Sequence, residues 1–125
     1  MTIETVHTDN APAAVGPYSQ ATKAGNLLFV SGQLGLIPGK GKLAEGFEAQ
    51  AVQAMDNLQA ILDAAGSGLD KVTVVEIFLT DMGRFKEFND IYARYFSEHK
   101  PARAAVQVAG LPLGGEVEVK CTALV

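Results

Sequence analysis

The sequence of 125 residues has a single cysteine, no long apolar run and no excess of basic residues. With Cys121 alone, no intramolecular disulfide can form, so the fold does not depend on one. No apolar run approaches the roughly 20 residues that a membrane-spanning helix needs. The first nine residues lack a basic stretch followed by an apolar one, which argues against a signal peptide. We therefore expect a cytoplasmic protein without a membrane partner.

Charge and motif content argue against several further classes of protein and of site. The formal net charge is −4 and the ten Lys and Arg residues are scattered, so we expect no nucleic-acid partner. His7 and His99 have no partner at the spacing of metal ligands, and neither a phosphate-binding loop nor a Ser/His/Asp set occurs. We expect no metal site. Cys121 falls on the apolar side of a predicted strand, which indicates a buried hydrophobic residue rather than a reactive thiol.

Composition and periodicity predict one α+β domain over residues 1–125. With 48% hydrophobic and 19% charged residues, the chain has the content of one globular core. Strands are predicted from alternation and from β-branched residues, and helices from apolar residues recurring at spacings of three and four. The predicted strands cover 2–7, 18–24, 27–31, 72–80, 101–109 and 116–125, and the predicted helices cover 45–65 and 84–96. Two helices can cover one face of such a sheet.

The other face of this sheet would expose apolar side chains, including Val74 and Phe78, unless something covers it. Association through that face is the simplest solution and predicts a homo-oligomer. The alternative is that the long loop 33–44 folds over the face.

The last two strands are expected to form a hairpin, with Ala109 opposite Glu116. Alternation then puts Ala104 and Val106 on the core side, and Arg103 on the face away from the helices together with Glu118. In this register the two charged residues lie roughly 13 Å apart, too far for one small ligand within a single chain. A neighbouring subunit could bring its own copy of either residue closer.

Arg103 and Glu118 are the main candidates for chemistry. Each, taken alone, is more often a solvated or ion-paired residue. However, the small Ala105 leaves room beside the guanidinium, whose planar fork suits a carboxylate. Further polar candidates, each more often structural than functional, are Tyr18, the Ser31-Gly32 pair with free backbone N–H groups for an anion, and Asn89.

Several separate segments, in the right order, resemble the Rid family of reactive-intermediate deaminases, also called the YjgF family. They are residues 10–20 (NAPAAVGPYSQ), 30–33 (VSGQ), 57–61 (NLQAI), 88–92 (FNDIY), 101–108 (PARAAVQV) and 117–119 (VEV).

This resemblance implies a chorismate-mutase-like fold in a homotrimer, with three sites in the clefts between subunits. It also implies hydrolysis of 2-imino and enamine acids to 2-oxo acids and ammonia without a cofactor. Arg103 matches the residue that holds the substrate carboxylate, and Glu118 matches the acid that activates or positions water. Tyr18, Ser31 and Gly32 match pocket residues.

The sequence departs from the family pattern at two informative positions. Ala105 stands where many related sequences carry cysteine, so thiol chemistry at that position does not transfer. Lys120 replaces a common acidic residue and alters the local charge.

Two other functions stay open: a module that binds a 2-oxo acid without turnover, and a chaperone or translation-inhibiting nuclease. The acidic charge balance argues against the nuclease.

Overall fold

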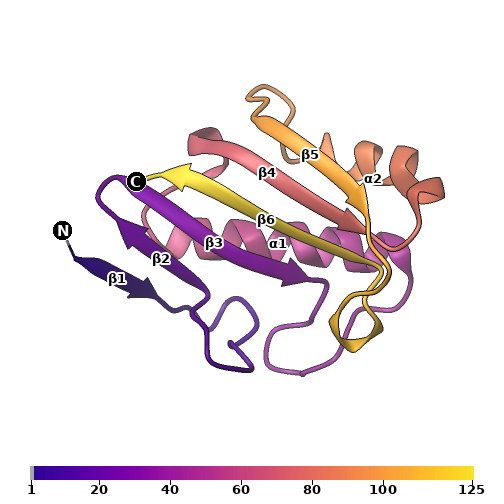
Figure 1. Ribbon diagram of the computed structural model, residues 1–125, viewed down its shortest axis with the longest axis horizontal. Coiled ribbons are helices and arrows are strands. Elements are labelled where there is room, and N and C mark those ends of the chain that lie inside the picture. Colours follow the sequence, from indigo (N-terminus) through magenta and orange to yellow (C-terminus); the bar gives the residue numbers. More distant parts are fainter. Residues whose placement is uncertain (1) are drawn as a thin grey trace.

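A computed structural model describes residues 2–125 as a six-stranded mixed sheet with two helices packed on one face (Figure 1). The strands are β1 (Ile3–Val6), β2 (Ala21–Ala24), β3 (Leu27–Leu34), β4 (Val72–Leu79), β5 (Ala102–Gln107) and β6 (Val117–Leu124). The helices are α1 (Phe47–Ala64) and α2 (Phe85–Tyr92), and three short 3₁₀ turns lie at Leu69–Lys71, Met82–Arg84 and Pro112–Gly114. The predicted α+β class with two helices on a mixed sheet is confirmed.

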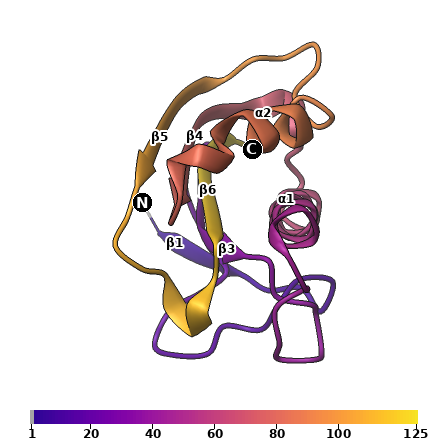
Figure 2. The same cartoon turned by 90° about the vertical axis from the view of Figure 1, so that its right-hand side faces the viewer.

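Helix α1 buries the stripe that its periodicity predicts. Phe47, Ala51, Met55, Leu58 and Leu62 are all buried against the sheet. Helix α2 is shorter than predicted, and Asp81 caps the 3₁₀ turn before it by accepting a hydrogen bond from the Gly83 N–H at 2.8 Å. Both helices lie on the same side of the sheet (Figure 2). In the part of the chain described here, neither helix is long and apolar enough to cross a membrane.

The strand order is β1-β2-β3-β6-β4-β5, and only β4 and β5 run parallel. The predicted hairpin between residues 101–109 and 116–125 is therefore wrong, because β4 lies between these two strands. The chain passes from β4 through α2 to β5, and a helical crossover of this kind places the next strand parallel to the first. Strand β6 occupies the centre, where Val117, Val119, Cys121 and Ala123 are buried as predicted.

Strand β5 is an exposed edge strand, and its two faces are the reverse of those predicted. Val106 is 46% exposed on the face without helices, whereas Ala105 is half-buried and packs against the core. The register explains this difference, since Ala105 pairs with the buried Ile77 and Val106 pairs with Phe78. Among residues 2–125, no strand pairs with the outer edge of β5, which leaves its backbone groups free for another chain.

The helix-free face of the sheet is uncovered, as the sequence predicts. Phe29 and Leu124 are more than 40% exposed there, in addition to Val106. The alternative that loop 33–44 covers this face is wrong, because the loop is tied to α1 on the other side of the sheet. The buried Asn57 side chain donates from Nδ2 to the carbonyl oxygens of Leu34 at 3.1 Å and Leu36 at 2.9 Å.

The contact between this loop and α1 leads to a prediction on stability. A Cβ atom added at Gly35 would lie 2.4 Å from the carbonyl oxygen of Gln50, which is backbone and cannot rotate away. We expect Gly35→Ala to lower the free energy of unfolding by roughly 1–3 kcal/mol or more. Urea denaturation measures this, with Gly110→Ala as the control because nothing lies within 4 Å of a Cβ there. Equal stability of the two variants would contradict the close approach.

Candidate functional site

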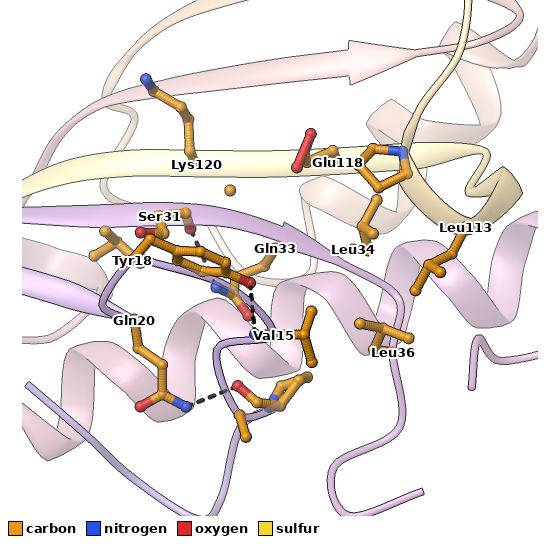
Figure 3. Close-up of a pocket in the computed structure, with 15 residues that line it drawn as sticks. Val15, Tyr18, Gln20, Ser31, Gln33, Leu34, Leu36, Leu113, Glu118 and Lys120 are labelled. Atoms are coloured by element: carbon orange, nitrogen blue, oxygen red, sulfur yellow. Dashed lines mark hydrogen bonds between the residues drawn. The ribbon is translucent and has the colours of Figure 1, made fainter. Parts of the chain in front are cut away.

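A pocket of about 530 Å³ opens where the helix-free face of the sheet meets the loops before β2 and before β6 (Figure 3). Its size is typical of small-molecule sites. Its polar side chains come from the loop before β2 and from strands β3 and β6, and they are Tyr18, Gln20, Ser31, Gln33, Glu118 and Lys120. Figure 3 shows Lys120 at one end of the pocket, together with Tyr18 and Ser31, and the leucines Leu34, Leu36 and Leu113 at the other.

The Glu118 carboxyl group packs directly over Gly32. A Cβ at Gly32 would lie 2.6 Å from Oε2 of Glu118, so only glycine leaves room for the carboxyl group in this position. Burial raises the pKa of Glu118 above its ordinary value, and the positive charge of Lys120 partly opposes that rise. A carboxyl group with a raised pKa in a pocket is a candidate for accepting and returning a proton.

Ser31 and Tyr18 line the pocket, but their hydrogen bonds differ from those expected. Strand β3 continues past Ser31 to Leu34, with an irregular register between Val30 and Gln33 that places Ser31 and Gly32 in a bulge. The Ser31 N–H is not free for an anion, since it donates to the Gln20 carbonyl oxygen at 2.9 Å. The Tyr18 hydroxyl accepts from the Val15 N–H at 3.4 Å, so its own O–H can still donate to a ligand.

Arg103 lies on the helix side of the sheet, at the β5 edge, which corrects the predicted face. Its guanidinium group donates from one terminal nitrogen to Oδ1 of Asn89 at 2.7 Å. The carbon of the guanidinium group also lies 5.4 Å from the ring centre of Phe85 and 5.0 Å from that of Tyr92. These contacts fix the guanidinium plane, while the Arg103 side chain keeps donors available at the surface.

Arg103 and Glu118 do not meet within the chain. In the register of β4, Arg103 pairs with Val75 and Glu118 pairs with Phe78, so the two residues point to opposite faces of the sheet. Strand β4 separates them by roughly 10 Å across the sheet, and three residue positions add roughly 10 Å along it. The expectation that both lie on one side is therefore wrong, whereas the expectation that one chain cannot bring them to one ligand holds.

The other two predicted site residues, Asn89 and Ala105, lie on the helix side of the sheet, as Arg103 does. Asn89, on α2, binds Arg103 and does not line the large pocket. It forms, with Arg103, Tyr92 and Lys100 among others, a smaller pocket of about 290 Å³. Ala105 faces the core and lines neither pocket, so the space beside Arg103 comes from α2 and not from Ala105.

Most of the residues that line the pocket were not predicted from the sequence, and two of them show why. Gln20 is buried and holds the preceding loop, since its amide accepts from the Thr8 N–H at 2.7 Å and donates to the Pro12 carbonyl oxygen at 2.8 Å. Leu113 is 65% exposed and extends from a 3₁₀ turn over the apolar end of the pocket. The only sequence signal for Leu113 is an apolar residue between Pro112 and Gly114 in a turn.

Other reactive side chains contribute little to the site. Cys121 is buried as predicted, and burial raises its pKa to about 12, which keeps the thiol protonated at neutral pH. Over residues 2–125, no group of three or more His, Cys, Asp or Glu residues is arranged to hold a metal ion.

The fold and its sites define an α+β protein that carries a carboxylate pocket on the open face of its sheet and an arginine on the other. Comparison with known proteins identifies the family. A model of the family described as endoribonuclease L-PSP matches residues 8–125. The chain belongs to this family, which is also the Rid or YjgF family.

The chain is similar to named proteins and to solved structures of this family. The chain is 50% identical to Reactive Intermediate Deaminase A, chloroplastic, of Arabidopsis thaliana, over 96% of this chain and 65% of that protein, so it spans slightly less than two thirds of that relative. It is 49% identical to RidA of an Antarctic Psychrobacter, with a TM-score of 0.95 over 98% of this chain and 99% of that one. It is 34% identical to E. coli TdcF, solved with bound serine, with a TM-score of 0.93 over 98% of each chain.

Proposed function

We propose that this protein hydrolyses reactive 2-imino and enamine acids, such as 2-iminobutanoate and 2-iminopropanoate, to 2-oxo acids and ammonia. We further propose that it does so in the cytoplasm as a homotrimer, with each site in a cleft between two subunits. The observation that carries the proposal is the placement of Arg103 and Glu118 on opposite faces of one sheet, each beside a pocket. A substrate that needs both residues must therefore bind between two chains.

In this proposal Arg103 holds the substrate carboxylate. Two parallel N–H···O bonds fix both the position and the plane of a carboxylate, which a lysine cannot do. Asn89 and the rings of Phe85 and Tyr92 already orient the guanidinium group, so binding costs less ordering of the side chain.

Glu118 then acts as the general base. Water adds to C2 of the protonated imine while Glu118 accepts a proton from that water. Glu118 returns this proton to the nitrogen of the resulting carbinolamine. It then accepts the proton of the C2 hydroxyl group as the C–N bond breaks, so ammonia leaves and the C=O bond forms. General-base help of this kind contributes about 10²–10⁴-fold. Tyr18, with its free O–H, is a donor to the developing oxygen.

Two further observations support the proposal. The Arabidopsis and Psychrobacter relatives carry the names Reactive Intermediate Deaminase A and RidA. The exposed β5 edge and the uncovered apolar face containing Phe29 and Val106 are surfaces that association between subunits would bury.

A trapping assay tests the activity. A threonine dehydratase supplies 2-iminobutanoate, semicarbazide traps what persists, and size-exclusion chromatography with light scattering gives the mass of the assembly. We expect the protein to suppress trapping and to behave as a trimer. A folded protein that leaves trapping unchanged would refute the deaminase.

The second candidate is a module that binds a 2-oxo or amino acid without turning it over. The serine bound in the TdcF structure favours it, since serine is an amino acid. Saturable binding of 2-oxobutanoate without any acceleration of imine loss would identify this function.

A prediction on affinity follows from the contact between Asn89 and Arg103. We expect Asn89→Ala to weaken binding of 2-oxobutanoate about tenfold, because it removes a hydrogen bond worth roughly 1–2 kcal/mol to a charged group. Asn89→Asp should weaken binding more, since a carboxylate beside the guanidinium competes with the ligand. Titration calorimetry measures both constants.

The control for this experiment is Asp90→Ala on the same helix, where the exposed carboxylate contacts only Lys86. Unchanged affinity in both Asn89 variants would show that Asn89 does not position Arg103.

A further inference from the structure

Leu113 has the one left-handed backbone conformation among the non-glycine residues from 2 to 125. Its φ is 60° and its ψ is 17°, a region that disfavours residues with a side chain. The next residue is Gly114, which also has a positive φ of 73° and supplies this conformation without steric cost. A large aliphatic side chain is thus kept where glycine would be easier, and conformational strain of this kind gathers at functional positions.

The turn that carries Leu113 is held in place from both sides. A Cβ at Gly115 would lie 3.0 Å from Cδ2 of Leu34, so the turn packs closely on the pocket wall. Next to it, the Glu116 N–H donates to Oε1 of Gln50 at 2.9 Å, and the Thr80 N–H donates to the Glu116 carbonyl oxygen at 3.2 Å. Because the backbone is fixed, the direction of the Leu113 side chain is set by the fold.

The pocket has a polar and an apolar end, and Leu113 belongs to the apolar one. Ser31 and Lys120 lie at the opposite end of the pocket from Leu113, and Glu118 lies between the two ends (Figure 3). Leu36 lies beside Leu113, and Val15 lies between Leu36 and Tyr18. None of these aliphatic side chains offers a hydrogen bond. The pocket of about 530 Å³ also exceeds what the acid and imine groups of a substrate need, so room remains for a substrate side chain.

We propose that Leu113 is a specificity-determining residue that, with Leu36 and Val15, selects substrates with an aliphatic side chain over small, hydroxylated or charged ones. This inference rests on the proposed function. The reacting atoms sit between Glu118 and an arginine of another subunit, and the substrate side chain extends toward Leu113. Burying apolar surface there favours a branched aliphatic chain, whereas a hydroxyl or carboxylate would lose its hydration without a partner.

Binding and turnover test the inference separately. Calorimetry compares 4-methyl-2-oxopentanoate with 2-oxopropanoate, and an amino-acid oxidase supplies the imines of leucine and alanine for the trapping assay. We expect the wild-type protein to favour the branched compound at least tenfold in both measurements, since side-chain contacts in apolar pockets give discrimination of about this size. Leu113→Gly should remove most of that preference and leave 2-oxopropanoate binding unchanged, and Leu113→Lys should do the same.

Leu124→Ala is the matched control, because Leu124 is exposed but lies outside the pocket. Equal affinity of the wild-type protein for both oxo acids, or an unchanged ratio in Leu113→Gly, would overturn the inference. A changed oligomeric state of Leu113→Gly with an unchanged ratio would overturn it in favour of a subunit contact. A binding preference without turnover of any imine would refute the deaminase but uphold this role of Leu113.

Discussion

Mixing the Arg103→Ala and Glu118→Gln proteins is expected to restore part of the activity that each variant has lost. Alone, Arg103→Ala should lower kcat/KM about 10²–10⁴-fold, since two hydrogen bonds to a charged group contribute roughly 3–6 kcal/mol together. Glu118→Gln should lower it by a similar factor. The two residues lie on opposite faces of the sheet, so each site would take Arg103 from one chain and Glu118 from another.

The expected recovery follows from the symmetry of a ring in which every interface is the same. After unfolding and refolding of an equal mixture, about a quarter of the sites would receive an intact Arg103 and an intact Glu118. The trapping assay should then give roughly a quarter of wild-type activity per site. Refolding Arg103→Ala with the double variant Arg103→Ala/Glu118→Gln is the control and should restore nothing. No recovery in the first mixture would mean that each chain completes its own site.

The sequence predicted the regular elements well because their signals are local. The stripe from Phe47 to Leu62 defines α1, and the β-branched run from Val72 to Leu79 defines β4. The neighbour of each strand was harder to predict. Alternation in β5 fixes which residues share a face, but not whether the strand pairs with β6 in a hairpin or with β4 through a crossover.

The wrong neighbour explains the wrong face for Arg103. Alternation predicts that the more apolar side of β5, with Val106, faces the core, but the side that faces the helices carries Arg103 and Gln107. Polar residues are tolerated there because α2 and the 3₁₀ turn before it supply partners. Asn89 accepts from Arg103, and Oε1 of Gln107 accepts from the Met82 N–H at 2.8 Å. Such tertiary hydrogen bonds leave no periodic trace in a sequence.

The pocket likewise contains residues that the sequence could predict and residues that it could not. Glu118 and Ser31 could be predicted because the family motifs mark them. Leu113 could not, because its role depends on a left-handed backbone conformation and on a loop that packs against Leu34. The bulge at Ser31 and Gly32 was also missed, since an apolar strand that ends in a glycine resembles a strand that stops.

Glu118→Gln is expected to be more stable than the wild-type protein at neutral pH although it is inactive. Burial raises the pKa of Glu118, so the charged carboxylate destabilises the folded state relative to the unfolded one. Below the unfolded-state pKa of about 4.5 the group is protonated in both states and this penalty is absent. As the pH rises from there through the higher folded-state pKa, the wild-type protein loses stability that the glutamine variant keeps.

Urea denaturation between pH 4 and pH 8 measures this difference, which should grow with pH and then level off.

The same ionisation controls activity, because only the carboxylate can accept a proton from water. The acid limb of kcat/KM should therefore lie above the ordinary pKa of a glutamate, and Lys120→Met should move it to still higher pH by removing the opposing positive charge. Gly32→Ala tests the position of the Glu118 carboxyl group separately from its charge, since the added Cβ would displace the carboxyl group while Glu118 stays in the sequence. If Glu118→Gln were less stable than the wild-type protein at every pH, the carboxylate would stabilise the fold. Its burial would then not be a loss of stability that is tolerated because catalysis needs the group.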